Sequence, residues 1–184
     1  NINLILDAFV VDLCHWVIYP LMEFNIDSFL FKRPNIWSEK MLTFVAKNVL
    51  QGLNYITKNS LKLYRLLPNK ILFDREGNVK LSITGLRPVP KQVLLEQDVV
   101  VDFTNTFSYS DYGDLERFLH GVNSSDKGSV LSLGVILSAI GFGDLRTPDS
   151  SRFKSSKRFS ESWKHFLFTS TEKKGDLRPK SAVL

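Results

Sequence analysis

The sequence reads LYRLLPNKILFD over residues 63–74 and REGNVKLSITGL over residues 75–86. Apolar residues crowd Ile71–Phe73 and alternate through Val79–Ile83, which is typical of two short strands. The five residues between them, DREGN over 74–78, carry a glycine and an asparagine where a tight turn needs them, which is a strong hairpin signal. We therefore expect a β-hairpin over residues 71–83.

Three helices are predicted, one before this hairpin and two after it. Ser38 is a plausible N-cap for a long helix that runs to about Thr57. The apolar residues expected on one face of that helix are Met41, Leu42, Val45, Val49, Leu53 and Ile56. Residues Val130–Ile140 are apolar all round, so we expect a helix in the middle of a bundle, and Ser160 could cap a third helix through Leu167.

The N-terminal part is predicted to be extended. Residues Phe9–Phe24 suggest two short strands, and Trp16–Phe24 is a near-continuous apolar run of the kind found in a covered strand. Asp27–Lys32 could form a short helix before Pro34. Residues Arg87–Gly113 show no clear period, and so long a loop in a compact domain is usually functional or disordered.

Composition sets broad limits on the function. The chain has 184 residues, 43% of them hydrophobic, and a net charge of +5, which fits one globular domain with a real core. Cys14 is the single cysteine, so no internal disulfide can form and a reducing compartment is expected. We expect a cytoplasmic location, with the nucleus as a second one.

The sequence disfavours a membrane helix, a nucleic-acid surface and a metal centre. The run Asn3–Met22 is interrupted by Asp7, Asp12 and His15, which argues against a membrane helix, and no secretory leader is visible. The late basic residues fit a solvated face better than a nucleic-acid surface. The histidines and Cys14 show no metal-ligand spacing, so no metal centre is predicted.

The opening stretch resembles the catalytic loop and metal loop of a protein kinase, H-R-D-L-x-P-x-N-I-L-x-D followed by V-K-L-x-D-F-G-L. Three further stretches, at Asp114–Glu116, Ser129–Gly134 and Asp176–Pro179, resemble later kinase motifs in the kinase order. The frame residues that match the two loops are Leu66, Pro68, Ile71, Leu72, Val79, Leu81, Gly85 and Leu86.

The resemblance implies a fold and a division of the chain. The implied fold class is mainly α: the C-terminal lobe of the protein kinase fold, a helical bundle with a short β-hairpin, plus one or two N-lobe strands and the hinge. Residues 1–184 would be a single kinase-like domain fragment. Residues 1–24 would be the last N-lobe strands, 25–35 the hinge and a short helix, and 36–184 the C-lobe, with the true N-lobe before residue 1. The resemblance also implies a structural ion pair between Glu116 and Arg178.

The residues that perform the chemistry in kinases are replaced. Arg65 stands in place of the base Asp, Lys70 in place of the metal-binding Asn, and Ile83 in place of the metal-binding Asp, followed by Thr84 and Gly85. A guanidinium cannot accept a proton, and neither a charged lysine nor an isoleucine offers an oxygen to Mg²⁺. Ordinary kinase activity and Mg²⁺ binding are therefore not expected, and no catalytic residue is assigned.

Two cations permit a different use of the same place. Arg65 and Lys70 could hold the phosphates of a nucleotide without a metal, so metal-free ATP is the one cofactor that we consider. The alternative is that both side chains face solvent or pair with nearby acids such as Asp74 or Glu76.

Phe9–Val17 resembles sterile-20-type kinases, and Phe159–Ala182 is similar to STRAD, the kinase adaptor family of that group. That resemblance implies a catalytically inactive adaptor that binds and allosterically activates or scaffolds an active protein kinase, with an armadillo-like scaffold protein as a second partner. Loop aromatics are expected to bind the kinase, as such side chains dominate interfaces; they are Phe103, Phe107, Tyr109 and Tyr112. The alternatives are an atypical serine/threonine kinase with displaced acids, and a regulatory pseudokinase domain of a larger multidomain protein.

Overall fold

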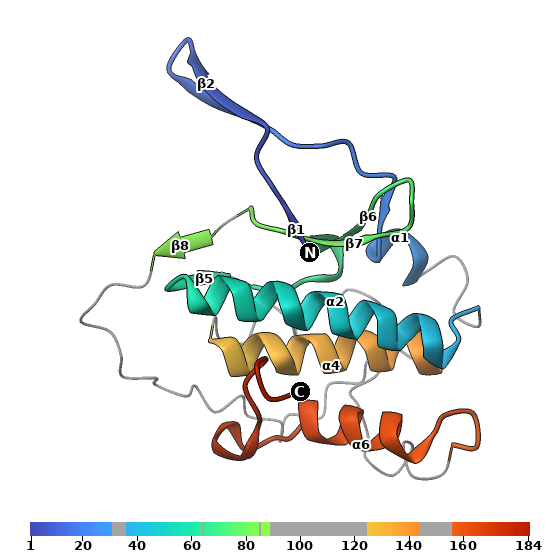
Figure 1. The fold of residues 1–184 in the computed structure, drawn as a ribbon. Coiled ribbons are helices and arrows are strands. Elements are labelled where there is room, and N and C mark those ends of the chain that lie inside the picture. The colour runs from blue at the N-terminus through green and yellow to red at the C-terminus, as the bar shows by residue number, and fades with distance from the viewer. Residues whose placement is uncertain (31–35, 64, 85, 89–124, 144–155) are drawn as a thin grey trace, which may run out of the picture.

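A computed structural model describes residues 1–30, 36–63, 65–84, 86–88, 125–143 and 156–184. Two long helices, α2 (Glu39–Lys58) and α4 (Asp126–Phe142), lie side by side, and α6 (Glu161–Ser170) packs on the other side of α4. A small sheet covers α2 on the side away from α6, as Figure 1 shows. The helices and the sheet therefore form successive layers with α4 in the middle.

The four-stranded sheet has the order β1-β7-β6-β4. Its strands are β1 (Ile2–Asn3), β4 (Phe24–Asn25), β6 (Ile71–Phe73) and β7 (Val79–Ser82). β6 and β7 form the predicted antiparallel hairpin, with Ile71 opposite Leu81 and Phe73 opposite Val79. Gly77 has a φ of 81° in the turn between them, a conformation that favours glycine. The hairpin prediction is confirmed.

The remaining strands form two-stranded ribbons. β2 (Asp7–Val11) pairs antiparallel with β3 (Cys14–Ile18), and β5 (Leu61–Leu63) pairs antiparallel with β8 (Leu86–Pro88). The short elements are the helix α1 (Asp27–Leu30) and the 3₁₀ turns η1 (Pro68–Lys70) and η2 (Gly175–Leu177). The described part is thus a mixed α/β structure, and the expectation of a mainly α fold, with a short hairpin plus one or two further strands, holds only in part. It missed the pairing of β1 and β4 with the hairpin because both strands are only two residues long.

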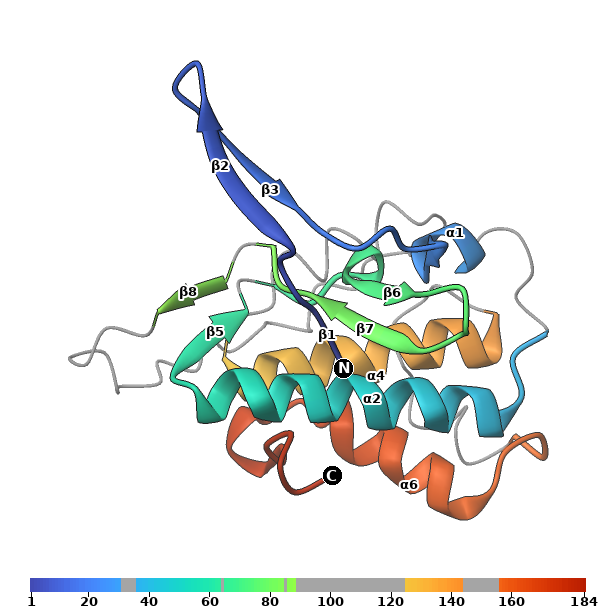
Figure 2. The same cartoon turned by 45° about the horizontal axis from the view of Figure 1, so that its top comes forward.

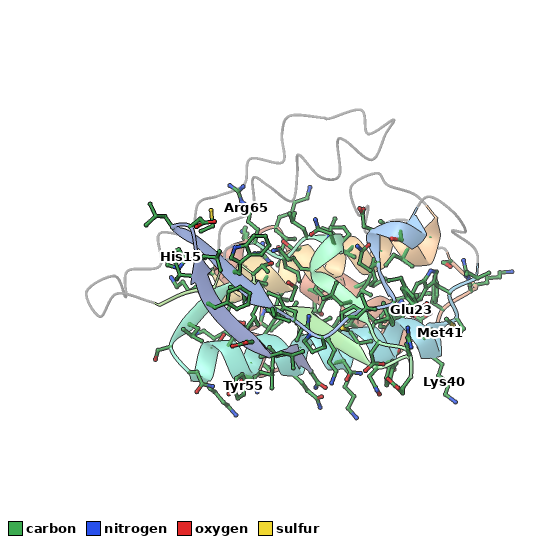
Figure 3. The ribbon with its side chains drawn as sticks, turned by 90° about the horizontal axis from the view of Figure 1, so that it is seen from above. His15, Glu23, Lys40, Met41, Tyr55 and Arg65 are labelled. Atoms are coloured by element: carbon green, nitrogen blue, oxygen red, sulfur yellow. The ribbon has the colours of Figure 1, made fainter. Side chains whose placement is uncertain are left out.

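Helix α2 begins where the sequence predicts. Ser38 is its N-cap, and its Oγ accepts a hydrogen bond from the Met41 amide at 3.3 Å. Five of the six predicted core residues of this helix are buried, but Met41 is exposed. The prediction for Met41 is wrong because the first turn of α2 projects past the edge of the sheet, and Figure 3 shows Met41 at the margin of the molecule.

Helix α4 is the centre of the core. All residues from Gly128 to Gly141 are buried, as expected for a helix that is apolar all round. At Gly134 an added Cβ would come within 2.9 Å of Thr171 Cγ2, so the glycine allows the end of α6 to approach α4 closely. Ser160 caps α6 through the Trp163 amide at 3.2 Å, which confirms the third predicted helix.

The hairpin β2–β3 projects from the body, as Figure 2 shows. The two predicted strands are present, but every residue in them is exposed, including Trp16 with 57% of its surface accessible. The expectation of a covered strand over Trp16–Phe24 is therefore wrong for the described chain. An apolar run indicates that a strand can be buried, but apart from its partner strand β2 the described elements do not pack extensively against β3.

Candidate functional site

The site predicted from the sequence lies at one end of the β6–β7 hairpin. The turn η1 leads directly into β6, and its Pro68 stands at the first position of the turn, where the missing amide costs nothing. Because Ile71 is opposite Leu81, Lys70 at the end of η1 comes next to the residues that follow Leu81. The hairpin register therefore brings the Arg65–Lys70 loop and the Ser82–Thr84 segment together.

Lys70 joins these two segments. Its Nζ donates a hydrogen bond to the Thr84 carbonyl oxygen at 3.0 Å and a second one to the Thr84 hydroxyl. The Thr84 hydroxyl is also hydrogen-bonded to Ser82 Oγ at 3.0 Å, and the Thr84 amide donates to the same Ser82 Oγ at 3.4 Å. One ammonium group thus sits in a small polar network that spans both loops.

Neutral oxygen atoms accept the described hydrogen bonds of the Lys70 ammonium group. Its described hydrogen bonds go to a carbonyl and a hydroxyl of Thr84, with no carboxylate among them. Burial lowers the pKa of Lys70 from its ordinary value, because removing water disfavours the charged form. The site therefore contains a half-buried positive charge that described acids do not neutralise.

The other mapped positions have different surroundings. Arg65 and Ile83 are half-buried, Thr84 is exposed, and Gly85 lies outside the described residues. Figure 3 shows the Arg65 side chain on the side of the molecule opposite Lys40 and Tyr55 of α2. The structure thus brings Lys70 to Thr84 in a defined contact, whereas a shared phosphate site for Arg65 and Lys70 stays a prediction.

Asp74, the suggested acidic partner of the two cations, has another role. Its carboxylate accepts hydrogen bonds from the Asn78 amide at 2.7 Å and from Asn78 Nδ2 at 3.0 Å. The hydrogen bond from the Asn78 side chain is the main cause that lowers the pKa of Asp74. Asp74 therefore fastens the hairpin turn at the end of β6 that is remote from Lys70.

Arg178 is buried, with 7% of its surface exposed. Its Nε and Nη2 donate to the Glu172 carbonyl at 3.0 and 2.6 Å, and its Nη1 donates to the Lys127 carbonyl at 3.2 Å. It thereby fastens the segment after α6 to the first turn of α4. Glu116 lies outside the described residues, so the predicted ion pair stays a prediction.

The four aromatic residues predicted to bind a partner also lie outside the described residues; they are Phe103, Phe107, Tyr109 and Tyr112. The structure does not bear on that prediction.

A groove of about 620 Å³ lies elsewhere, between α2, α6 and the last residues of the chain. Leu50, Trp163 and Phe166 supply its apolar wall, and Glu39 and Lys47 stand among its polar residues. No local sequence pattern predicts this groove, because its walls come from segments more than 100 residues apart. Among the described residues that replace the kinase catalytic and metal-binding groups, Arg65, Lys70 and Ile83 do not line this groove.

The described residues contain neither a metal-binding cluster nor a membrane-spanning helix. No three His, Cys, Asp or Glu side chains in the described ranges gather in a way that could hold a metal ion. Among the described helices, none combines the length and the apolar character needed to cross a membrane.

Comparison with known proteins gives distant matches to protein kinases. Mitogen-activated protein kinase kinase 10 of Arabidopsis thaliana is 27% identical over 126 residues, which are 68% of this chain and 39% of that protein. The TBC domain-containing protein kinase-like protein of Gallus gallus is 33% identical over 121 residues, 59% of this chain and 13% of that protein. No model of a protein family matches the chain.

These matches define the class of protein at a coarse level. The chain is kinase-like by distant similarity over part of its length, and it spans well under two thirds of either relative. The kinase resemblance of the loops at Lys70 and Thr84 is thereby supported as a resemblance to protein kinases in general.

Proposed function

We propose that this chain is the kinase-like part of a pseudokinase, a catalytically inactive adaptor that acts by binding an active protein kinase. The observation that carries the proposal is the Lys70 contact. Lys70 takes the position of a metal-binding asparagine and donates to Thr84, so an ammonium group fills the space between the two loops.

The replacements act together against phosphoryl transfer. The reaction needs a group that accepts the proton of the attacking hydroxyl and oxygens that hold Mg²⁺ against the phosphates. The guanidinium group of Arg65 carries only donors and cannot accept that proton. Ile83 has no oxygen in its side chain, and the oxygens of Thr84 already accept hydrogen bonds from Lys70.

The fold around the site remains intact, which supports a role in binding. Helix α4 is buried along its whole central part, and Arg178 still joins the segment after α6 to α4. A protein that retains its framework without the chemical groups can recognise one conformation of a partner and shift that partner's equilibrium. The proposed partners are an active protein kinase and an armadillo-like scaffold protein.

Transfer of labelled phosphate from Mg²⁺·ATP to a generic substrate tests the absence of catalysis. The expected result is no transfer above a buffer control. Transfer by the unmodified chain that Lys70→Met abolishes would instead support an atypical kinase with displaced acids.

The binding role is tested by co-purification with an active kinase. The double variant Phe103→Ala with Phe107→Ala should weaken binding without lowering the melting temperature, because large loop aromatics carry much of the energy of an interface. Tyr55→Ala is the matched control, since Tyr55 is an exposed aromatic residue on α2. Unchanged binding by the double variant would reject this surface.

A regulatory pseudokinase domain of a larger protein is the second candidate. It is favoured by the match to a chicken protein whose name includes both a TBC domain and a kinase-like part, of which the matched region is 13%. Mass analysis of the endogenous protein decides between the two: a polypeptide far longer than 184 residues with a second folded domain supports the multidomain candidate.

A further inference from the structure

The kinase likeness implies a Mg²⁺ ion between the two loops, and the described residues there do not fit one. Mg²⁺ needs near-octahedral oxygen ligands and is usually held by carboxylates. The side chains that face the junction are Lys70, a cation, and Thr84, whose hydroxyl and carbonyl oxygens both accept from Lys70. Ile83 contributes no donor atom, so the donor set lacks the negative charge that a divalent ion requires.

We propose that the Lys70 ammonium is the resident cation of this site and joins the two loops in place of a metal ion. The inference rests on the proposed non-catalytic function of the same site. It adds to that function a physical device, a covalently attached cation that keeps the loops closed at any metal concentration.

The geometry supports such a junction. Lys70 and Thr84 are 14 residues apart in sequence, with β6 and β7 between them, so their contact closes a loop that contains the whole hairpin. The network continues from Thr84 to Ser82, the last residue of β7, and therefore ties the end of the strand to η1. A metal ion bridging the same two loops would also hold both to a common point.

Electrostatic repulsion disfavours a Mg²⁺ ion beside the Lys70 ammonium group. A half-buried ammonium repels a divalent ion at close range more strongly than it would in water, because the local dielectric is lower. The described hydrogen-bond partners of Lys70 are neutral, so a metal ion entering the junction would meet a positive charge that these partners do not offset. Closing by Lys70 and binding of Mg²⁺ are therefore mutually exclusive.

Hydrogen exchange of the segment 79–84 tests the inference. The unmodified chain, Lys70→Met and the control Lys80→Met are compared in EDTA and in millimolar Mg²⁺. Lys80 lies in β7 opposite Leu72, so its replacement changes the charge of the same hairpin without touching the junction.

We expect exchange at Ser82–Thr84 to increase up to about fivefold in Lys70→Met, because a charged donor is lost and relief of its desolvation offsets part of that loss. Mg²⁺ should not restore the protection, EDTA should not reduce it in the unmodified chain, and Lys80→Met should behave like the unmodified chain. Equal exchange in Lys70→Met and the unmodified chain, or protection of the unmodified chain that depends on Mg²⁺, overturns the inference.

Thr84→Val probes the same contact if Lys70→Met does not fold. Thr84 is exposed, so its replacement should leave the fold intact while removing the hydroxyl that Lys70 contacts. A smaller increase in exchange is expected, and no increase counts against the junction. The phosphate-transfer assay tests the proposed function separately. If the chain transfers no phosphate and Lys70→Met leaves the exchange of residues 79–84 unchanged, only the inference is refuted. If the chain transfers phosphate and its exchange does not depend on Mg²⁺, only the proposed function is refuted.

Discussion

Arg178 and Lys70 are two cations that fasten the chain in the same chemical way, yet they serve different parts of the molecule. Both donate to backbone carbonyl oxygens across a gap in sequence, Arg178 to Lys127 and Lys70 to Thr84. Arg178 is buried between α4 and the segment after α6, whereas Lys70 is half-buried between two loops at the end of a hairpin.

The difference separates the framework from the site. Arg178 is identical to the arginine that the kinase resemblance implies at its position, and its contacts hold the segment after α6 to α4. Lys70 replaces an asparagine that the resemblance implies, and its contacts hold only loops. This difference agrees with the proposed function, in which the framework is retained and Lys70 bridges the two loops.

The largest effect is expected in the framework, where Leu137 of α4 is fully buried. Leu137→Ala removes buried methyl groups and leaves a cavity, so we expect a loss of about 2–5 kcal/mol in the free energy of unfolding. Urea unfolding followed by circular dichroism measures it. A loss below that of a surface variant would show that α4 is not the packed centre.

Replacing Arg178 and Lys70 in turn with methionine tests whether the two cations stabilise the fold to different extents. Arg178→Met leaves the Glu172 and Lys127 carbonyls without a charged donor, and we expect a loss of about 1.5–3 kcal/mol. Lys70→Met should change the unfolding free energy by no more than about 1 kcal/mol, because relief of the desolvated charge offsets the lost hydrogen bonds. The two midpoints in urea are compared directly, and an equal loss for both variants would remove the distinction.

A smaller and pH-dependent effect is expected at Asp74. Its pKa is lowered in the folded chain, so the unfolded chain binds more protons over the window between the two pKa values. The stabilisation is therefore present above about pH 4 and is lost as the pH falls through the folded pKa. Asp74→Asn should flatten the acid limb of a plot of melting temperature against pH and leave neutral pH nearly unchanged; an acid limb identical to that of the unmodified chain would contradict this role.

The smallest effect is expected in the hairpin β2–β3. Trp16 is exposed, so Trp16→Ser should change the unfolding free energy by less than about 0.5 kcal/mol. Thermal unfolding measures the change. A clear destabilisation would mean that the hairpin packs against part of the protein in solution, and that the framework extends further than α2, α4 and α6.

The elements were more predictable from sequence than their burial. Ser38 and Ser160 marked two helix starts, and the all-apolar run after Val130 marked the central helix, because capping and periodicity are local. The exposure of Met41 and Trp16 was missed, since burial depends on which distant segment arrives to cover a residue.

The site was predictable in composition and only partly in geometry. The replacements at Arg65, Lys70 and Ile83 can be read by aligning the loops with kinase motifs. The contact of Lys70 with Thr84 was missed, although the hairpin length contained a signal: a turn over 74–78 places Ile71 opposite Leu81 and hence Lys70 beside the segment after Ser82. The direction of a lysine side chain cannot be read from register alone.

The most direct test of a kinase-like framework closed by Lys70 is paramagnetic broadening of amide NMR signals by Mn²⁺, which substitutes for Mg²⁺ in oxygen sites. Titration of the isotope-labelled chain into the submillimolar range should leave the Ser82 and Thr84 amides no more broadened than exposed amides of α2. Selective broadening centred on Thr84 that excess Mg²⁺ reverses would show a metal ion at the junction and contradict the account.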